Sequence, residues 1–138
     1  MNKRPSPLVS IIIPCYNQGQ YLPEALLSVQ RSTYSPIEIV IVDDGSTDLL
    51  TRKALHRINN KHIKIFRQNN HGVSAARNKG IQASRGKYFL PLDADDAITP
   101  TYLEKAIALL ERDPSLGFVY SYVQFFGDVH YLWKAPSV

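Results

Sequence analysis

Residues 87–99, KYFLPLDADDAIT, join a short apolar run to three carboxylates within four positions. The apolar part suits a strand, and Asp93, Asp95 and Asp96 follow it. In an extended segment side chains two positions apart share a face, so Asp93 and Asp95 are expected to point together while Ala94 and Asp96 point away. Because like charges repel, this crowding predicts a cation among the acids.

The cation that such oxygens favour is hard and divalent. Magnesium and manganese are commonly held by one or two carboxylates, with substrate phosphates and waters completing the shell. The cluster therefore predicts Mn²⁺ or Mg²⁺ and a phosphate-bearing substrate. A simpler interpretation, which a lone D-x-D leaves open, is an acidic turn with one aspartate capping the next helix.

The rest of the chain alternates predicted strands with predicted helices. Two continuous β-branched runs, VSIII and IEIVIV, are typical of strands buried on both faces of a parallel sheet. Strands are expected at 8–13, 37–42, 62–66, 88–90 and 117–126, and helices at 21–31, 48–58, 73–84 and 100–112. Short connections between them predict a doubly wound, mostly parallel α/β sheet with flanking helices.

Several local signals set the expected boundaries. Pro14 is expected to close the first strand, Ser46 or Thr47 to cap the second helix, and Thr99 to cap the last one. Gly80 inside the third helix predicts a close backbone approach, because glycine there costs about 1 kcal/mol relative to alanine.

Ligands of doubly wound sheets bind at the carboxyl ends of the strands. Three polar groups follow such ends: Tyr16 with Asn17, Asp43 with Asp44, and the acidic cluster at 93–96. The sequence therefore predicts one site at this rim. Neither a G-x-G-x-x-G nor a P-loop motif is present, so neither a dinucleotide fold nor a P-loop is indicated.

Composition bounds the function classes. With 138 residues, 44% of them hydrophobic, the chain suits a single globular domain. The net charge of +4 is modest, and the basic residues are not interleaved with aromatic residues along one element, so nucleic acid is not an expected partner. No apolar run reaches the length of a membrane span. Cys15, the one cysteine, is expected to be buried and structural, which suits a cytoplasmic location.

Four ordered motifs carry a family resemblance: VSIIIPCYN, IVDDGSTD, NHGVSAARNKGI and YFLPLDADD. Together they resemble the nucleotide-binding half of inverting family-2 glycosyltransferases with the GT-A fold, over residues 9–123. The resemblance implies metal-assisted transfer of a sugar, with inversion, from a nucleotide diphosphate sugar to an acceptor hydroxyl. It implies a UDP-linked donor, and an acceptor carbohydrate or lipid-linked glycan, which would allow a peripheral location at the inner face of a membrane.

The resemblance also implies roles for the residues that end the first two strands. Tyr16 matches a tyrosine that stacks on the nucleotide base, with a core tyrosine as its alternative. Asp44 matches an acid that accepts a hydrogen bond from the base, usually uracil. Asp43 belongs to the same donor-binding set, although capping a turn or helix is its alternative role. Pro14 and Asn17 complete this part of the set.

Further along the chain, Arg77 and Asn78 match a polar pair near the donor phosphates or ribose, with a solvated helix face as the alternative. Asp95 matches the metal ligand. Asp93 is oriented toward the ribose or a metal-bound water and is the second metal ligand, and Ala94 belongs with it to the donor-binding surface.

The general base of inversion is expected beyond Val138, because the family's base lies in a later segment and only Asp128 is an acid nearby. We therefore expect a lead-in at 1–7, the nucleotide-sugar-binding part at 8–126 and the tail of a truncated domain at 127–138. Aromatic residues of the C-terminal region are then expected to be exposed and to drive self-association. Two alternatives stay open, a binding module without turnover and, from the acidic pair at 43–44, a phospho-receiver signalling domain.

Overall fold

A computed structural model describes residues 5–135 of the chain, so residues 1–4 of the expected lead-in and 136–138 of the expected tail lie outside the described residues. The chain divides into two compact units, Met1–Tyr102 and Leu103–Val138. No helix within the described range combines the length and apolar character needed to span a bilayer.

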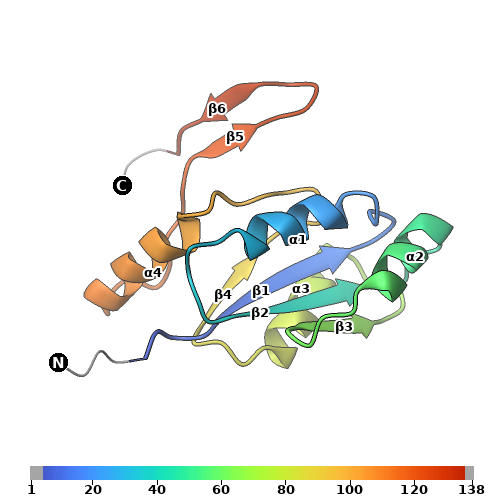
Figure 1. The fold of residues 1–138 in the computed structure, drawn as a ribbon, viewed down its shortest axis with the longest axis horizontal. Helices are drawn as coiled ribbons and strands as arrows, with labels where there is room; N and C mark the ends of the chain where they lie inside the picture. The colour runs from blue at the N-terminus through green and yellow to red at the C-terminus, as the bar shows by residue number, and fades with distance from the viewer. Residues whose placement is uncertain (1–4, 136–138) are drawn as a thin grey trace. The chain divides into compact units, whose positions relative to one another are not determined.

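The first unit is a four-stranded parallel sheet with helices on its faces (Figure 1). Its strands are β1 (Val9–Cys15), β2 (Ile37–Asp43), β3 (Ile63–Arg67) and β4 (Tyr88–Pro91), in the order β3-β2-β1-β4. Its helices are α1 (Leu22–Gln30), α2 (Leu49–Arg57) and α3 (Val73–Ala83). The predicted doubly wound α/β class is confirmed, and these elements lie within two residues of the expected boundaries.

Both faces of the sheet are buried. Successive side chains of a strand point to opposite faces, and residues in register on adjacent strands point to the same face. Ile12, Val40 and Val42 form one face and pack against Ala76 of α3. Ile11 and Ile13 of β1 and Ile39 and Ile41 of β2 point to the opposite face and are also buried. In Figure 1 α3 lies behind the sheet and α1 in front of it. This two-faced burial explains the continuous apolar runs in the sequence.

The strand order creates a switch point between β1 and β4. The chain runs outward from β1 through β2 to β3, and α3 then carries it back across the sheet to β4 on the other side of β1. Crossovers on either side of this point leave a crevice at the carboxyl ends of β1 and β4. The segments that follow Cys15 and Pro91 therefore flank the expected ligand position.

Gly80 permits the close packing of α3 on this sheet. A Cβ at position 80 would lie 2.4 Å from Cγ2 of Ile12, which is buried in β1. The predicted close approach at Gly80 is confirmed.

Pro14 lies inside β1 and does not close it. The strand continues to Cys15, and Pro14 is in register with Val42 of β2. On the other side the β4 ladder stops at Pro91, and the next bond runs from the Leu92 N–H to the Ile12 carbonyl. No partner strand remains there for an N–H at position 14, so proline is tolerated.

Two helix starts also differ from the expectation. Asp48 caps α2, because its Oδ1 accepts a 2.7 Å hydrogen bond from the Thr51 N–H, and neither Ser46 nor Thr47 does so. The last helix, α4 (Tyr102–Arg112), begins after a turn and not directly at Thr99.

The second unit holds most of α4 and an antiparallel pair, β5 (Val123–Phe125) and β6 (Tyr131–Trp133). The ten-residue strand expected at 117–126 is therefore wrong, since only three of these residues are in a strand. Phe125 and Tyr131 stack with ring centroids 4.3 Å apart, yet each side chain is half exposed. The expected exposure of C-terminal aromatic residues is confirmed, and self-association through them stays a prediction.

Candidate functional site

A pocket of about 460 Å³ lies at the carboxyl ends of the strands in the first unit. Five of the predicted site residues line it: Pro14, Tyr16, Asp44, Asp93 and Asp95. They follow or end three different strands, and parallel strands bring those ends to one rim. The predicted convergence of the acids after β2 and β4 is thus present in the structure.

Asp44 is the most constrained acid of the pocket. Its side chain is buried, and it accepts hydrogen bonds from Gln68 Nε2 at 2.7 Å, from the His71 N–H at 3.0 Å and from the Gly72 N–H at 2.8 Å. Burial raises the pKa of Asp44, but the bonds from His71, Gln68 and Gly72 outweigh it, so the pKa is lowered. Asp44 is therefore ionised at neutral pH and fixes the loop that leads into α3.

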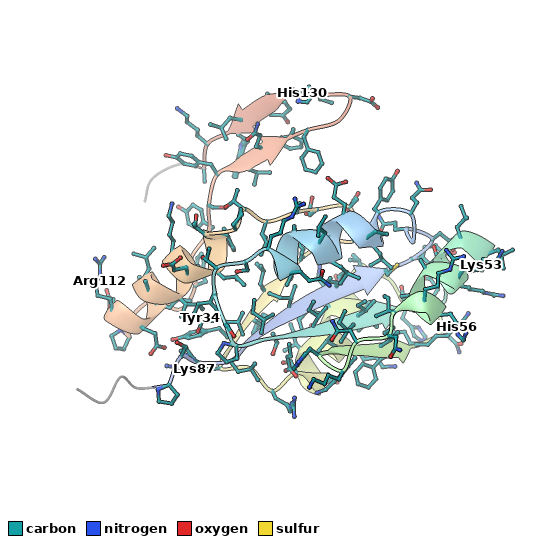
Figure 2. The ribbon with its side chains drawn as sticks, in the orientation of Figure 1. Tyr34, Lys53, His56, Lys87, Arg112 and His130 are labelled. Atoms are coloured by element: carbon teal, nitrogen blue, oxygen red, sulfur yellow. The ribbon has the colours of Figure 1, made fainter. Side chains whose placement is uncertain are left out.

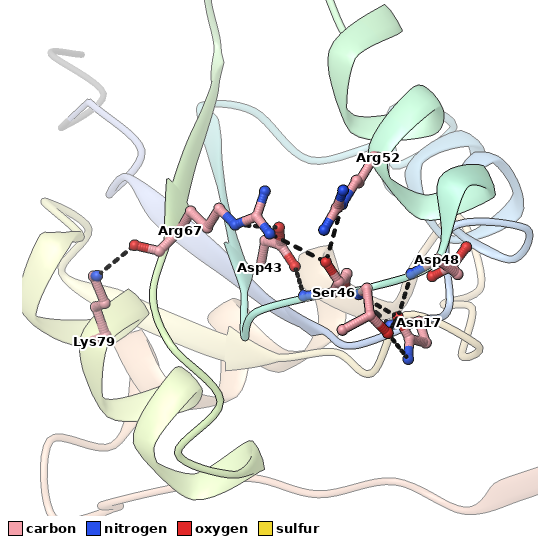
Figure 3. Close-up of polar contacts among 8 residues, drawn as sticks. Asn17, Asp43, Ser46, Asp48, Arg52, Arg67 and Lys79 are labelled. Carbon is pink, nitrogen blue, oxygen red and sulfur yellow. Dashed lines mark hydrogen bonds and ion pairs between the residues drawn. The ribbon is translucent and has the colours of Figure 1, made fainter.

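Asp43, its neighbour, points elsewhere. Its Oδ1 accepts a 2.8 Å hydrogen bond from the Ser46 N–H, and its Oδ2 lies 3.6 Å from Arg67 Nε. Figure 3 shows the Arg67 and Arg52 side chains converging on the Ser46 carbonyl behind this turn. These contacts assign Asp43 to the turn, and its expected place in the donor-binding set is not supported, because adjacent residues of a strand end face opposite ways.

Asn17 has a bridging role between two strand ends. It adopts a left-handed conformation (φ 54°), and its Oδ1 accepts from the Thr47 and Asp48 N–H groups at 2.9 and 3.1 Å (Figure 3). Its own N–H donates to Ser46 Oγ at 3.0 Å. Asn17 thus ties the loop after β1 to the start of α2 and shapes the rim without lining the pocket.

The acidic cluster forms a turn and not an extended segment. The Asp96 N–H donates to the Asp93 carbonyl at 3.0 Å, which reverses the chain around Ala94 and Asp95. Ala94 is fully buried, while Asp93 and Asp95 both line the pocket. Burial and the charges of Asp93 and Asp95 raise the pKa of Asp96, with Arg77 opposing them. The predicted crowding of negative charge is therefore present.

Arg77 connects α3 to this cluster. Its Nη2 donates to Asp93 Oδ1 at 2.5 Å, whereas its buried Nε has no hydrogen-bond partner among the described residues. Asn78, the other member of the predicted polar pair, is exposed on α3 and does not line the pocket. Arg77 alone of this pair therefore faces the acids.

The acidic residues fit a divalent cation that shares its shell with substrate. Within residues 5–135 no group of three or more His, Cys, Asp or Glu side chains converges as a complete metal cage. Asp93 and Asp95 offer carboxylate oxygens at one pocket wall, next to a carboxyl group whose pKa their charges raise. This donor set matches the incomplete, oxygen-only protein shell that Mg²⁺ and Mn²⁺ accept when phosphates complete it.

Sequence reasoning missed the wall that comes from the loop before α3 and its first turn. Asn70, Gly72, Val73 and Ala76 also line the pocket, and Gly72 has a φ of 88° that favours glycine. The run NHG before the helix was the available signal. Cys15 also lines the pocket, and burial raises the pKa of its thiol to about 11, so the prediction of a structural cysteine agrees with its environment.

A phospho-receiver domain would need the acidic pair to follow the first strand of the chain. Here the pair follows the second strand. One aspartate of the pair caps a turn and the other holds a loop. The receiver interpretation therefore has no support in this site.

Comparison with solved structures agrees with the fold. The structure of Staphylococcus aureus TarS 1–349 in complex with UDP-GlcNAc matches 75% of this chain and 31% of its own, with a TM-score of 0.67 and 30% identity. The mannosyltransferase PcManGT from Pyrobaculum calidifontis, in complex with GDP-Man and Mn²⁺, matches 84% of this chain and 35% of its own, with a TM-score of 0.73 and 27% identity.

Comparison of sequences gives the family. An uncharacterized glycosyltransferase of Haemophilus influenzae is 39% identical over 121 residues, which are 86% of this chain and 37% of the relative. The chain thus spans little more than a third of that relative's length. Residues 10–137 match the sequence model described as Glycosyl transferase family 2. The chain belongs to this family, as the resemblance of its four motifs predicted.

Proposed function

We propose that this chain forms the donor side of an enzyme that transfers a sugar from a UDP-linked donor to an acceptor hydroxyl, with inversion and with help from a divalent cation. The observation that carries the proposal is the shared pocket, where Tyr16, Asp44 and the Asp93–Asp95 pair meet from three strand ends. An aromatic ring, a buried carboxylate and a pair of acids are the groups that a base and a metal-bound diphosphate require.

The base would lie between Tyr16 and Asp44. The ring of Tyr16 is 44% exposed and lines the pocket, so its face is accessible for stacking. The Asp44 carboxylate accepts three hydrogen bonds, which leaves one of about four acceptor positions for a donor such as the ring N–H of uracil. The UDP-GlcNAc complex of TarS supports a uridine donor.

The diphosphate would lie toward Asp93 and Asp95, which would hold the Mn²⁺ or Mg²⁺ ion. Bound there, the cation would supply Lewis-acid stabilisation of the negative charge that develops on the leaving diphosphate. Arg77 adds a fixed positive charge beside the same acids, and its partnerless Nε has a proton to donate to a phosphate oxygen. The Mn²⁺ complex of PcManGT supports a metal role.

The acceptor side belongs to the same proposal. The general base would come from residues beyond Val138, because the described pocket is lined by acids already engaged with the loop or the metal position. A lipid-linked glycan acceptor would bring the reaction to a membrane surface, where a peripherally bound enzyme meets its acceptor.

The competing proposal is a module that binds nucleotide sugar without turning it over. It is favoured by one observation, namely that the chain spans 37% of the relative's length. Calorimetric titration of UDP with Mn²⁺, run beside a donor-hydrolysis assay with UDP-sugars, separates the two. Binding without hydrolysis is the result expected for this chain alone, and measurable turnover would place a base within these residues.

The binding site itself is tested by three substitutions. Tyr16→Ala and Asp44→Asn should each weaken UDP binding about tenfold or more, since each removes one contact to the base. Asp95→Asn should remove the Mn²⁺ dependence of binding. Glu24→Gln, which neutralises an exposed acid in the first turn of α1, is the matched control. UDP affinity that is unchanged in all three variants would overturn the proposal.

A further inference from the structure

Charge is distributed very unevenly along the first unit. From residue 49 to residue 92 the chain has no aspartate or glutamate, while it has ten lysines and arginines. This segment contains α2, β3, α3 and β4. Since the whole chain has a net charge of only +4, the remaining residues carry a net negative charge and the positive potential is concentrated on this segment.

Most of these cations have a local contact, and Arg52 of α2 is one of them, since its Nε donates to the Ser46 carbonyl. Lys64 and Arg85 pair with Glu38, and Arg67 pairs with Asp43. In contrast, Lys53 and Arg57 have no acidic partner within residues 5–135, and both are exposed. Figure 2 shows Lys53 extending from α2 at the edge of the unit, and His56 on the same helix.

The outer face of α2 also carries two exposed leucines. Leu49 is 63% exposed and Leu50 is 65% exposed, whereas Thr51 and Leu55 make the buried face of the helix. At 100° per residue Lys53 lies next to both leucines, one turn further along the helix. Two large aliphatic side chains in solvent beside unpaired cations form the pattern of a helix that lies on a bilayer.

We propose that the outer face of α2, defined as Leu49, Leu50, Lys53, His56 and Arg57, docks the protein on an anionic membrane surface. Lysine and arginine would contact lipid phosphates, while the two leucines would enter the boundary between headgroups and acyl chains. A nucleic acid would use the cations but not the leucines, and α2 has no aromatic side chain of the Phe, Tyr or Trp type on which a base could stack. The observations therefore favour a bilayer over RNA or DNA.

The position of α2 places this surface near the site. Asn17, which directly follows the pocket residue Tyr16, accepts hydrogen bonds from the backbone of Thr47 and Asp48 at the start of α2. A bilayer bound at Leu49 and Leu50 would therefore lie close to the pocket rim. Membrane binding is measured on the protein without nucleotide. A negative result would therefore overturn the membrane proposal and leave the donor-site proposal untouched, and absent UDP binding would do the opposite.

The test is co-sedimentation of the full chain with vesicles. Phosphatidylcholine vesicles are compared with vesicles that contain about one third phosphatidylglycerol, at about 0.1 M and about 0.5 M salt. We expect binding to the anionic vesicles only, weakened by salt. Lys53→Glu with Arg57→Glu should weaken it about tenfold or more, and Leu49→Ser with Leu50→Ser should weaken it about tenfold without any change of charge.

The matched control is Lys105→Glu with Lys134→Glu, which changes net charge equally in the second unit, at exposed positions. It should keep most of the binding, and circular dichroism should show all variants folded. An equal loss in this control would overturn the proposal in favour of a net-charge effect. The proposal would also be overturned if the chain bound no vesicles or bound neutral vesicles equally well. Tighter binding to duplex RNA, unchanged by Leu49→Ser with Leu50→Ser, would overturn it as well.

Discussion

Arg77 Nη2 donates a 2.5 Å hydrogen bond to Oδ1 of Asp93, and this bond joins α3 to the acidic turn after β4. The Arg77 guanidinium also acts on Asp96, whose pKa is raised by burial and by the charges of Asp93 and Asp95. The positive charge opposes the rise in the pKa of Asp96 but does not cancel it. The acidic turn therefore carries more negative charge than Arg77 balances.

This balance predicts how Arg77→Met and Mn²⁺ act together. Because both partners of the ion pair are partly exposed, the substitution should cost less than about 1 kcal/mol of unfolding free energy without metal. Saturating Mn²⁺ should reduce this difference, since the cation replaces the lost positive charge. Thermal unfolding with and without Mn²⁺ measures both effects, with Arg77→Lys as the charge-conserving control. An identical cost of Arg77→Met under both conditions would contradict the metal position.

Asp44 and Asp48 allow stability and binding to be separated. Asp44→Asn turns one acceptor oxygen into a donor that faces N–H groups, and should cost about 1–3 kcal/mol and weaken UDP binding. Asp48→Ala removes the α2 cap and should cost about 1 kcal/mol. Urea unfolding and calorimetry of both variants check this. Loss of UDP affinity in Asp48→Ala equal to that in Asp44→Asn would mean that general loosening, and not the Asp44 contact, explains the effect.

How much the sequence predicts depends on whether a feature is local or tertiary. The β-branched runs of β1 and β2 predict buried strands, and the carboxyl ends of parallel strands lie at one rim. The sequence alone therefore predicts that Asp44 and Asp95 lie at the same rim. The three hydrogen-bond donors to Asp44 could not be predicted in this way, because two of them are backbone N–H groups, which carry no sequence signal. The prediction of a strand over 117–126 was wrong, because β-propensity shows only that a segment suits a strand and not whether a partner strand lies beside it.

The amino ends of the strands carry a buried acid that makes stability depend on pH. Glu38 accepts hydrogen bonds from the Arg85 N–H, from Ser10 Oγ at 2.8 Å and from Lys64 Nζ at 3.2 Å. Burial by itself raises the pKa of Glu38, but these bonds and the Arg85 side chain bring the pKa down to about 2. The carboxylate therefore binds its proton more weakly in the folded protein than in the unfolded chain.

A lowered pKa contributes stability above the unfolded value near 4.5, and this contribution is lost as the pH falls toward 2. We expect unfolding free energy to drop by up to about 3 kcal/mol across that window. Glu38→Gln should be less stable at pH 7 and should flatten the profile. Urea unfolding from pH 7 to about pH 2 tests it, with Glu24→Gln as the exposed control. A slope in Glu38→Gln as steep as in the unmodified protein would assign the acid sensitivity to other groups.

Gly80 is expected to resist the substitution that normally stabilises a helix. Alanine gains about 1 kcal/mol over glycine in a helix interior, but its Cβ at position 80 would lie 2.4 Å from Cγ2 of the buried Ile12. Overpacking a core contact costs about 1–3 kcal/mol, so Gly80→Ala should lower the urea midpoint. Gln82→Ala, at an exposed position of the same helix, should leave it unchanged or raise it.

Ile12→Leu removes the β-branched methyl that the added Cβ would meet, so the double variant should lose less stability than the two single losses together. Additive losses would place the cost of Gly80→Ala in the backbone of α3 and not in its contact with β1.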